Sequence, residues 1–218
     1  MSAEDPAITQ AAALAALGQR RRLPRTAADE LATAAATDPD GRVRAAALGA
    51  LVRAGAAGRA RDVWHQAVDD PDPAVRRRAA NLAPTLAGRG APDALVDPLT
   101  ALLADPDVTV VEAAAFALGE LDAAVVHADA VSTLATTVIE HCDPIAREAA
   151  VAALGALGQP AGLPAVLAAC NDKPAVRRRA VLALAPFSGP EVDAALAAAM
   201  NDKDWQVRQA AEDLLDES

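Results

Sequence analysis

The chain has 218 residues, of which 53% are hydrophobic, only 2% are aromatic and 61 are alanine, and its net charge is −10. The apolar fraction argues against disorder, the shortage of aromatic residues argues against a β-sandwich, and 12 glycines are too few for collagen. Because alanine is the best helix former and packs closely, the composition predicts an all-α protein.

The acidic charge is concentrated in the second half of the chain. Residues 1–109 carry 13 basic and 14 acidic groups, whereas residues 110–218 carry 7 and 16. An acidic chain repels nucleic acid and anionic membranes at long range, so we expect neither as a partner. The 18 arginines against two lysines fit either a high-GC genome or a salt-adapted proteome.

Signals for export or membrane insertion are not evident in the sequence. Met1 leads into polar and acidic residues, unlike a secretory leader. Every apolar stretch is interrupted well before the roughly 18 residues that a membrane span needs. Cys142 and Cys170 lack the paired spacing of a zinc ribbon or a disulfide framework. We therefore expect a cytoplasmic protein with two reduced, partly buried thiols.

One helical pattern recurs in seven copies. In each copy an anchor residue is followed by alanine at +4 and by small or apolar residues near +7 and +8, offsets that trace one face of an α-helix. The anchors are Thr9, Val43, Val75, Val110, Ala146, Val176 and Val207, with spacings of 34, 32, 35, 36, 30 and 31 residues. Alanine at +4 lets neighbouring helices approach, and a larger residue would overpack the contact.

In chain order, the pattern predicts a lone helix over about residues 6–18 and then six helix pairs. The first helices are expected at 27–37, 57–69, 92–104, 127–141, 160–171 and 190–201, and each second helix carries an anchor. Turns rich in Asp and Pro separate the two helices of a pair, because Asp caps a helix start and Pro tolerates its first turn. Pro98 and Pro164 should mark first turns or kinks. The glycines expected to end a preceding helix are Gly55, Gly88, Gly90, Gly158 and Gly189.

A single helix pair cannot bury its apolar face, so neighbouring pairs must stack into one continuous core. We expect one domain over 1–218, a right-handed α-α superhelix of about 13 helices. The expected repeats are 1–20 (partial), 26–55, 57–88, 91–122, 127–158, 160–187 and 190–218.

The pattern Asp-Pro-Asp-x-x-Val-Arg-x-x-Ala-x-x-Ala-Leu-Gly resembles the short HEAT repeat of phycobilisome lyase-like proteins, over essentially the whole chain. The resemblance implies that each second helix lines a concave groove. It also implies a structural ladder between repeats, made by a turn aspartate and the arginine after the anchor. The matching aspartates are Asp40, Asp72, Asp107, Asp143 and Asp204. The matching arginines are Arg44, Arg76, Arg147, Arg177 and Arg208, and the third full copy departs with Val111.

No catalytic or metal-binding constellation is found. The HEAT-like deoxyhypusine hydroxylases hold two irons with repeated His-Glu pairs, but none of His65, His127 and His141 is followed by Glu. The triplet His141-Cys142-Asp143 should point in different directions and lacks a fourth ligand. Phosphate loops and nucleophile elbows are also missing. We therefore expect no enzyme activity, no cofactor and no metal.

The groove positions are +2, +3 and +6 of each second helix. The expected partner-binding residues among them are Arg77, Arg78, Asn81, Glu112, Phe116, Glu148, Arg178 and Arg179. Phe116 either forms the apolar centre of this surface, ringed by charges that set specificity, or tucks between helices.

The favoured interpretation is a non-enzymatic scaffold or adaptor that binds another protein through its concave groove. One alternative is a phycobilin lyase-like accessory protein that handles a tetrapyrrole or serves a cofactor enzyme, which would need an exposed thiol of lowered pKa. Another is a DNA glycosylase-like binder, which would need a basic groove with aromatic contacts. Its one supporting feature is the run Arg20-Arg21-Arg22 with Arg25, which we interpret as a solvated linker.

Overall fold

The computed structural model describes residues 5–19 and 23–216. Within these residues the chain forms 13 α-helices and two short 3-10 segments, with no β-strand, which confirms the predicted all-α class. The run Arg20-Arg21-Arg22 lies outside the described residues, and Arg25 is the first residue of a helix.

The helices form a lone first helix and six consecutive pairs. They are α1 (Pro6–Leu17), α2 (Arg25–Thr37), α3 (Gly41–Arg53), α4 (Ala57–Ala67), α5 (Pro73–Ala87), α6 (Asp93–Ala101), α7 (Val108–Gly119), α8 (Ala128–Glu140), α9 (Pro144–Leu157), α10 (Leu163–Ala169), α11 (Pro174–Ala183), α12 (Pro190–Ala199) and α13 (Trp205–Asp216). The 3-10 segments are η1 (Leu102–Ala104), after α6, and η2 (Pro160–Gly162), before α10.

Some of the glycines and prolines expected to mark helix ends lie where the sequence predicts, and two do not. Gly158 caps α9 in the left-handed conformation with φ of 60°, and Pro164 lies in the first turn of α10. Pro98 instead lies inside α6. Gly189 does not end the preceding helix, because α11 already ends at Ala183. With φ of 125°, Gly189 is the residue that introduces α12.

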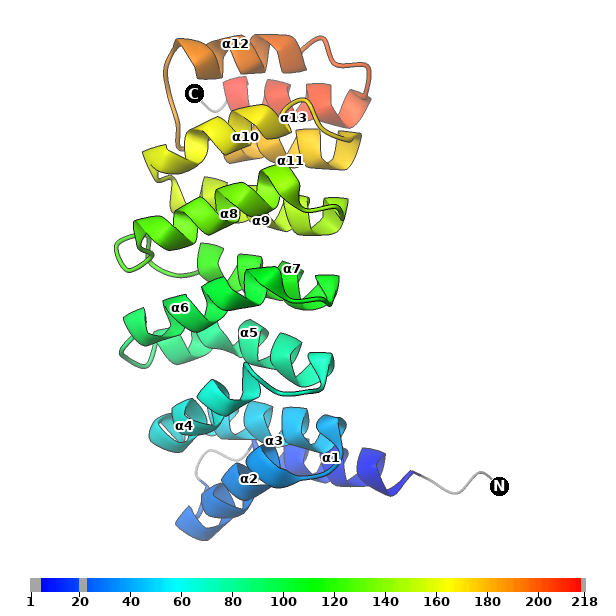
Figure 1. Cartoon of the computed structure of the whole chain (residues 1–218), viewed down its shortest axis with the longest axis vertical. Helices are drawn as coiled ribbons and strands as arrows, with labels where there is room; N and C mark the ends of the chain where they lie inside the picture. The colour runs from blue at the N-terminus through cyan, green and yellow to red at the C-terminus, as the bar shows by residue number, and fades with distance from the viewer. Residues whose placement is uncertain (1–4, 20–22, 217–218) are drawn as a thin grey trace. The chain divides into compact units, whose positions relative to one another are not determined.

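The chain divides into two compact units, Met1–Pro98 and Leu99–Ser218, with the division inside α6. Each unit has two layers of helices (Figure 1). In the first unit α3 packs between α1 and α5, and α2 packs against α3 and α4. In the second unit α7, α9, α11 and α13 pack in succession, while α10 packs against α8 and α12. The single domain over 1–218 stays a prediction.

Alanine at +4 is buried in six of the seven copies. Ala47, Ala79, Ala114, Ala150, Ala180 and Ala211 have no exposed surface. The first copy differs, since Ala13 is exposed and none of the residues of α1 is buried.

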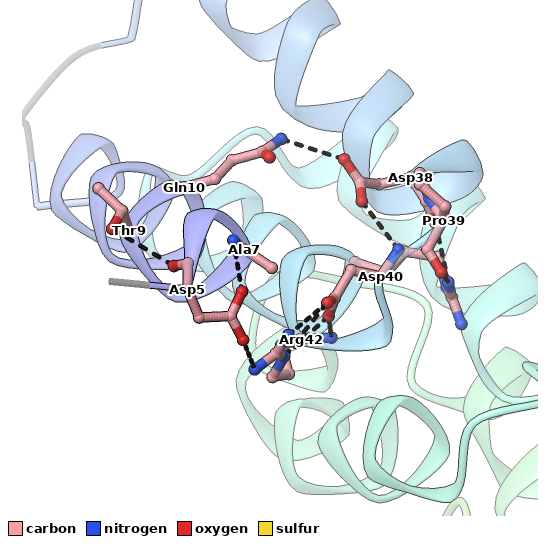
Figure 2. A network of polar contacts seen from close by, with 9 residues as sticks. Asp5, Ala7, Thr9, Gln10, Asp38, Pro39, Asp40 and Arg42 are labelled. Carbon is pink, nitrogen blue, oxygen red and sulfur yellow. Dashed lines mark hydrogen bonds and ion pairs between the residues drawn. The ribbon is translucent and has the colours of Figure 1, made fainter. Parts of the chain in front are cut away.

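Polar contacts join the start of α1 to α3 and to the turn that precedes α3 (Figure 2). Arg42, just inside α3, donates hydrogen bonds to Asp5 at 2.7 Å and to Asp40 at 2.6 Å, the residues that cap α1 and α3. Gln10 of α1 donates to Asp38 at 3.0 Å. The side-chain and backbone hydrogen bonds from Arg42 lower the pKa of Asp40 to about 2, so this carboxylate stays charged well into acid.

The aspartates expected to form the ladder cap helices instead. In each of them a side-chain oxygen accepts the backbone N–H two residues later, at 2.8–2.9 Å. They are Asp40, Asp72, Asp107, Asp143 and Asp204. Each carboxylate thus caps its own helix start, where it also complements the helix dipole.

The rungs between repeats use an acid that precedes the cap: Asp70 and Asp202 lie two residues before the caps Asp72 and Asp204, and Asp172 lies one residue before the cap residue Lys173. Arg44 binds Asp70 through Nε and Nη2, both at 2.7 Å. Arg147 binds Asp172 in the same way at 2.6 and 2.8 Å. Arg177 binds Asp202 at 2.8 and 2.7 Å. Each of these arginines therefore ties its own second helix to the turn of the next repeat.

The same arginines also donate hydrogen bonds to the turns that precede their own helices. Arg44, Arg147 and Arg177 donate Nη1 to a carbonyl of the turn that precedes their helix, at 2.8 Å. Arg76 and Arg208 make the equivalent bond at 2.7 Å. The arginines of the predicted ladder thus lie where the sequence indicated, whereas the acids that they bind in the next repeat lie one or two residues before the helix cap.

Candidate functional site

Five large apolar side chains are exposed on the second helices of the second unit. Phe116 on α7 is 56% exposed, Ile145 on α9 50%, Leu182 on α11 37%, and Trp205 and Leu215 on α13 64% and 46%. These helices pack in succession (Figure 1). Solvated aromatic side chains that can be buried by a partner are typical of binding hot spots, so this layer is the candidate site.

Phe116 lies in a groove of about 560 Å³ that we call the α7–α9 groove. It is lined by Glu112, Phe116, Gly119, Glu120, Ile145, Glu148, Ala149, Ala152, Ala153, Ala156 and Arg179. One wall is the α7 stripe Glu112, Phe116 and Glu120, whose four-residue spacing puts all three on one helix face. Most of the lining from α9 is alanine, so a ligand could approach that helix closely.

The one cation that lines this groove is engaged by an acid. Arg179 of α11 lies 3.5 Å from Glu148 of α9, with both side chains partly exposed to solvent. An ion pair of this kind is worth little in water, so a ligand can exchange either partner at small cost.

A smaller groove follows on the same layer of helices. It has a volume of about 240 Å³ and lies between α11 and α13. Its lining residues are Arg178, Leu182, Trp205, Gln206, Gln209, Ala210 and Asp213. With one basic and one acidic residue beside Trp205, it has no dominant charge.

The structure brings together half of the predicted binding residues. Glu112, Phe116, Glu148 and Arg179 line the α7–α9 groove, and Arg178 lines the smaller one. Phe116 is exposed and does not tuck between helices.

The remaining three predicted residues, Arg77, Arg78 and Asn81, are on α5 in the first unit. Arg77 and Asn81 are exposed and Arg78 is half-buried. The guanidinium of Arg78 lies over Gly49, where an added Cβ would be 2.4 Å from Nη2. Burial and the nearby charge of Arg53 lower the pKa of Arg78.

The predicted binding set left out Glu120, Ile145, Leu182 and Trp205, the large or charged residues that also line these grooves. Leu182 is at the same +6 position as Phe116 and was expected to face the groove, but it was not included in the binding set. Ile145 and Trp205 lie one and two residues before their anchors, and Glu120 lies at +10. Helical periodicity repeats about every seven residues, so extending the +2, +3, +6 stripe by two turns in each direction would have found Glu120 and Ile145. Trp205, at −2, lies off this stripe.

His127, His141 and the buried tryptophan serve the fold. The Nδ1 atom of His127 accepts the N–H of Ala130 at 3.3 Å at the start of α8. His141 likewise accepts the N–H of Asp143 through Nδ1 at 3.0 Å, in the turn before α9. Trp64 is fully buried and donates to the carbonyl of Ala79 at 2.7 Å.

Neither thiol lines the α7–α9 groove. Cys142 is exposed in the turn between α8 and α9, and Cys170 is partly buried at the end of α10. Burial raises the pKa of Cys170 to about 11, opposite to the lowering that a thiol attaching a tetrapyrrole would need.

Residues 5–19 and 23–216 contain no group of three or more His, Cys, Asp or Glu that could hold a metal ion. None of the helices described is both long enough and apolar enough to cross a bilayer.

Comparison with known proteins identifies the repeat. A family model described as HEAT repeats matches residues 61–138 and 131–216. No curated protein sequence matches the chain. Among solved structures, YibA of Escherichia coli is 19% identical with a TM-score of 0.70, over 100% of this chain and 78% of its own.

Two further solved structures hold partners. Kap121p bound to Pho4p is 16% identical with a TM-score of 0.73, over 98% of this chain and 26% of its own. A designed armadillo repeat protein in complex with the peptide (KR)4 is 19% identical with a TM-score of 0.59, over 93% of this chain and 98% of its own. At these identities the similarity shows a shared repeat fold.

Proposed function

The chain belongs to the HEAT-repeat family, and from this premise we propose that it is a non-enzymatic adaptor that binds another protein through the α7–α9 groove. The observation that carries the proposal is the exposure of Phe116 and Ile145 at a groove whose rim is charged. An exposed aromatic residue gains most from burial when polar residues around it exclude water from the contact.

Two considerations support a protein partner over a small substrate. The groove lies across successive helices, its α9 side is lined mainly by alanine, and its lining includes no histidine or cysteine, so it offers contact area more than reactive groups. The structures of Kap121p and of the designed armadillo protein hold a protein or a peptide, which fits this use of the fold. The cytoplasmic location stays a prediction.

Site-specific photocrosslinking tests the proposal. A benzophenone amino acid replaces Phe116 in one variant and Ile139 in the other, and both are expressed in the native cells. Ile139 is a matched control, because it is 57% exposed and lies on α8 in the other helix layer of the same unit. We expect a protein adduct from position 116 and none of the same mass from position 139.

The partner found in this way allows a quantitative check. Phe116→Ala should weaken its binding about tenfold, the effect of losing about 1.4 kcal/mol, mainly through faster dissociation. Ile139→Ala should leave the affinity unchanged. Adducts from position 139 alone, or no adduct from position 116, would show that the α7–α9 groove is not the interface.

A further inference from the structure

We infer that the α7–α9 groove selects a segment in which two basic side chains flank one large apolar side chain. This inference rests on the proposed function and deepens it by naming the chemistry of the partner. It follows from the order of residues along α7, the balance of charge in the groove and the shape of the facing helix.

The α7 wall presents an acid, an aromatic ring and a second acid in a row. Glu112, Phe116 and Glu120 are exposed and are separated by four residues each, so they form one stripe along the helix. Eight residues of helix place the two carboxylates about 12 Å apart along the axis. A ligand that covers Phe116 therefore meets a negative charge on either side.

The charge balance of the groove favours a cationic segment. Three glutamates and one arginine line it, and the arginine, Arg179, is already next to Glu148. The carboxylates of Glu112 and Glu120 make no hydrogen bond or ion pair within the described residues. Because residues 110–218 carry 7 basic and 16 acidic groups, the surrounding field also attracts positive charge.

The facing helix sets how the segment can approach. Ala149, Ala152 and Ala156 of α9 line the groove opposite Phe116, and their short side chains let a partner's backbone come close. An apolar side chain entering here would contact Phe116 and Ile145. Two basic residues about four positions apart in an extended segment span about 13 Å, which matches the separation of the two carboxylates.

Selection from a phage-displayed library of random peptides tests the inference on the full chain. The parent protein, Phe116→Ala and the double variant Glu112→Lys/Glu120→Lys each serve as bait. Glu30→Lys/Asp62→Lys is the matched control, with the same change of charge at two exposed acids on α2 and α4. Circular dichroism checks that every variant keeps its helices.

We expect the parent and the control to enrich peptides with an apolar residue between two lysines or arginines. A synthetic peptide of the enriched sequence should bind Phe116→Ala and Glu112→Lys/Glu120→Lys about tenfold or more weakly than the parent. Its affinity for the parent should fall several-fold as salt rises, because the attraction is screened.

Two other outcomes separate this inference from the proposed function. Enrichment of neutral or acidic peptides that still need Phe116 would overturn the basic motif and leave the groove as the interface. Failure to enrich any peptide that depends on Phe116 would overturn both. Equal loss of binding in the control variant would show that the net charge of the chain, and not the α7 stripe, drives the binding.

Discussion

Glycine and alanine meet at the same point in several neighbouring repeats. A Cβ added to Gly155 on α9 would lie 2.6 Å from the Cα of Ala183 on α11. The same contact recurs between Gly119 and Ala153 at 2.9 Å. In both cases the obstacle is backbone, which cannot rotate away as a side chain could. The glycine of the Ala-Leu-Gly signature is therefore required by close helix packing.

We predict that Gly155→Ala destabilises the second unit. The added methyl group overpacks the α9–α11 contact at a cost of about 1–3 kcal/mol, which exceeds the gain in helix propensity of about 1 kcal/mol. Gly58→Ala on α4 is the matched control, because a Cβ there meets nothing within 4 Å, and it should be neutral or mildly stabilising. Urea unfolding followed by circular dichroism measures both, and equal midpoints would show that α9 and α11 do not pack this closely.

At the scale of the element, the ladder joins α3, α9 and α11 to the turn of the next repeat. At one further position, after α7, both the arginine and the acid are replaced. Val111 occupies the place of the arginine and is fully buried. His141 occupies the place of the acid that would have received it, two residues before the cap Asp143. Because both partners changed, no charge is left unpaired at this position. The two sequence departures therefore have one structural explanation.

We predict that the last rung contributes stability that depends on pH. Hydrogen bonding from Arg177, against the opposing effect of burial, lowers the pKa of Asp202 from its ordinary value of 3.8. A carboxyl with a lowered folded-state pKa adds stability that is present above pH 3.8 and is lost as the pH falls through the folded value. Asp202→Asn should therefore cost about 1–3 kcal/mol at neutral pH.

The difference between Asp202→Asn and the parent should shrink as the pH falls below about 4. Denaturant unfolding at a series of pH values measures it. Glu212→Gln provides the control, since this exposed side chain on α13 makes no hydrogen bond within the described residues. A difference that stays constant with pH would mean that Asp202 acts through packing and not through its charge.

At the scale of the whole molecule, helix order was predictable because each repeat depends mainly on its neighbours. The division of the chain into two units inside α6 was not predictable, because the same periodicity runs through both units. The rung acid was also beyond the sequence: Asp70 and Asp72 are chemically identical, and only geometry decides which one caps the helix. Only some of the residues that line the groove were predicted. Phe116 follows from its position after the anchor, whereas Ile145 comes before its anchor and was not considered.

The charge of the whole molecule supports the last prediction, that the protein does not bind nucleic acid. Its net charge is −10, and the α7–α9 groove is lined by three glutamates. The fluorescence anisotropy of a labelled DNA duplex should not change as the protein is added, either at about 0.15 M salt or at about 0.01 M salt, where weaker screening increases the repulsion. A phosphate-binding protein would instead bind more tightly as salt falls.

Arg77→Ala/Arg78→Ala is the informative comparison, because these α5 arginines were the basic pair predicted for the first unit. Binding that grows at low salt and disappears in this variant would contradict the prediction and make α5 a nucleic-acid surface.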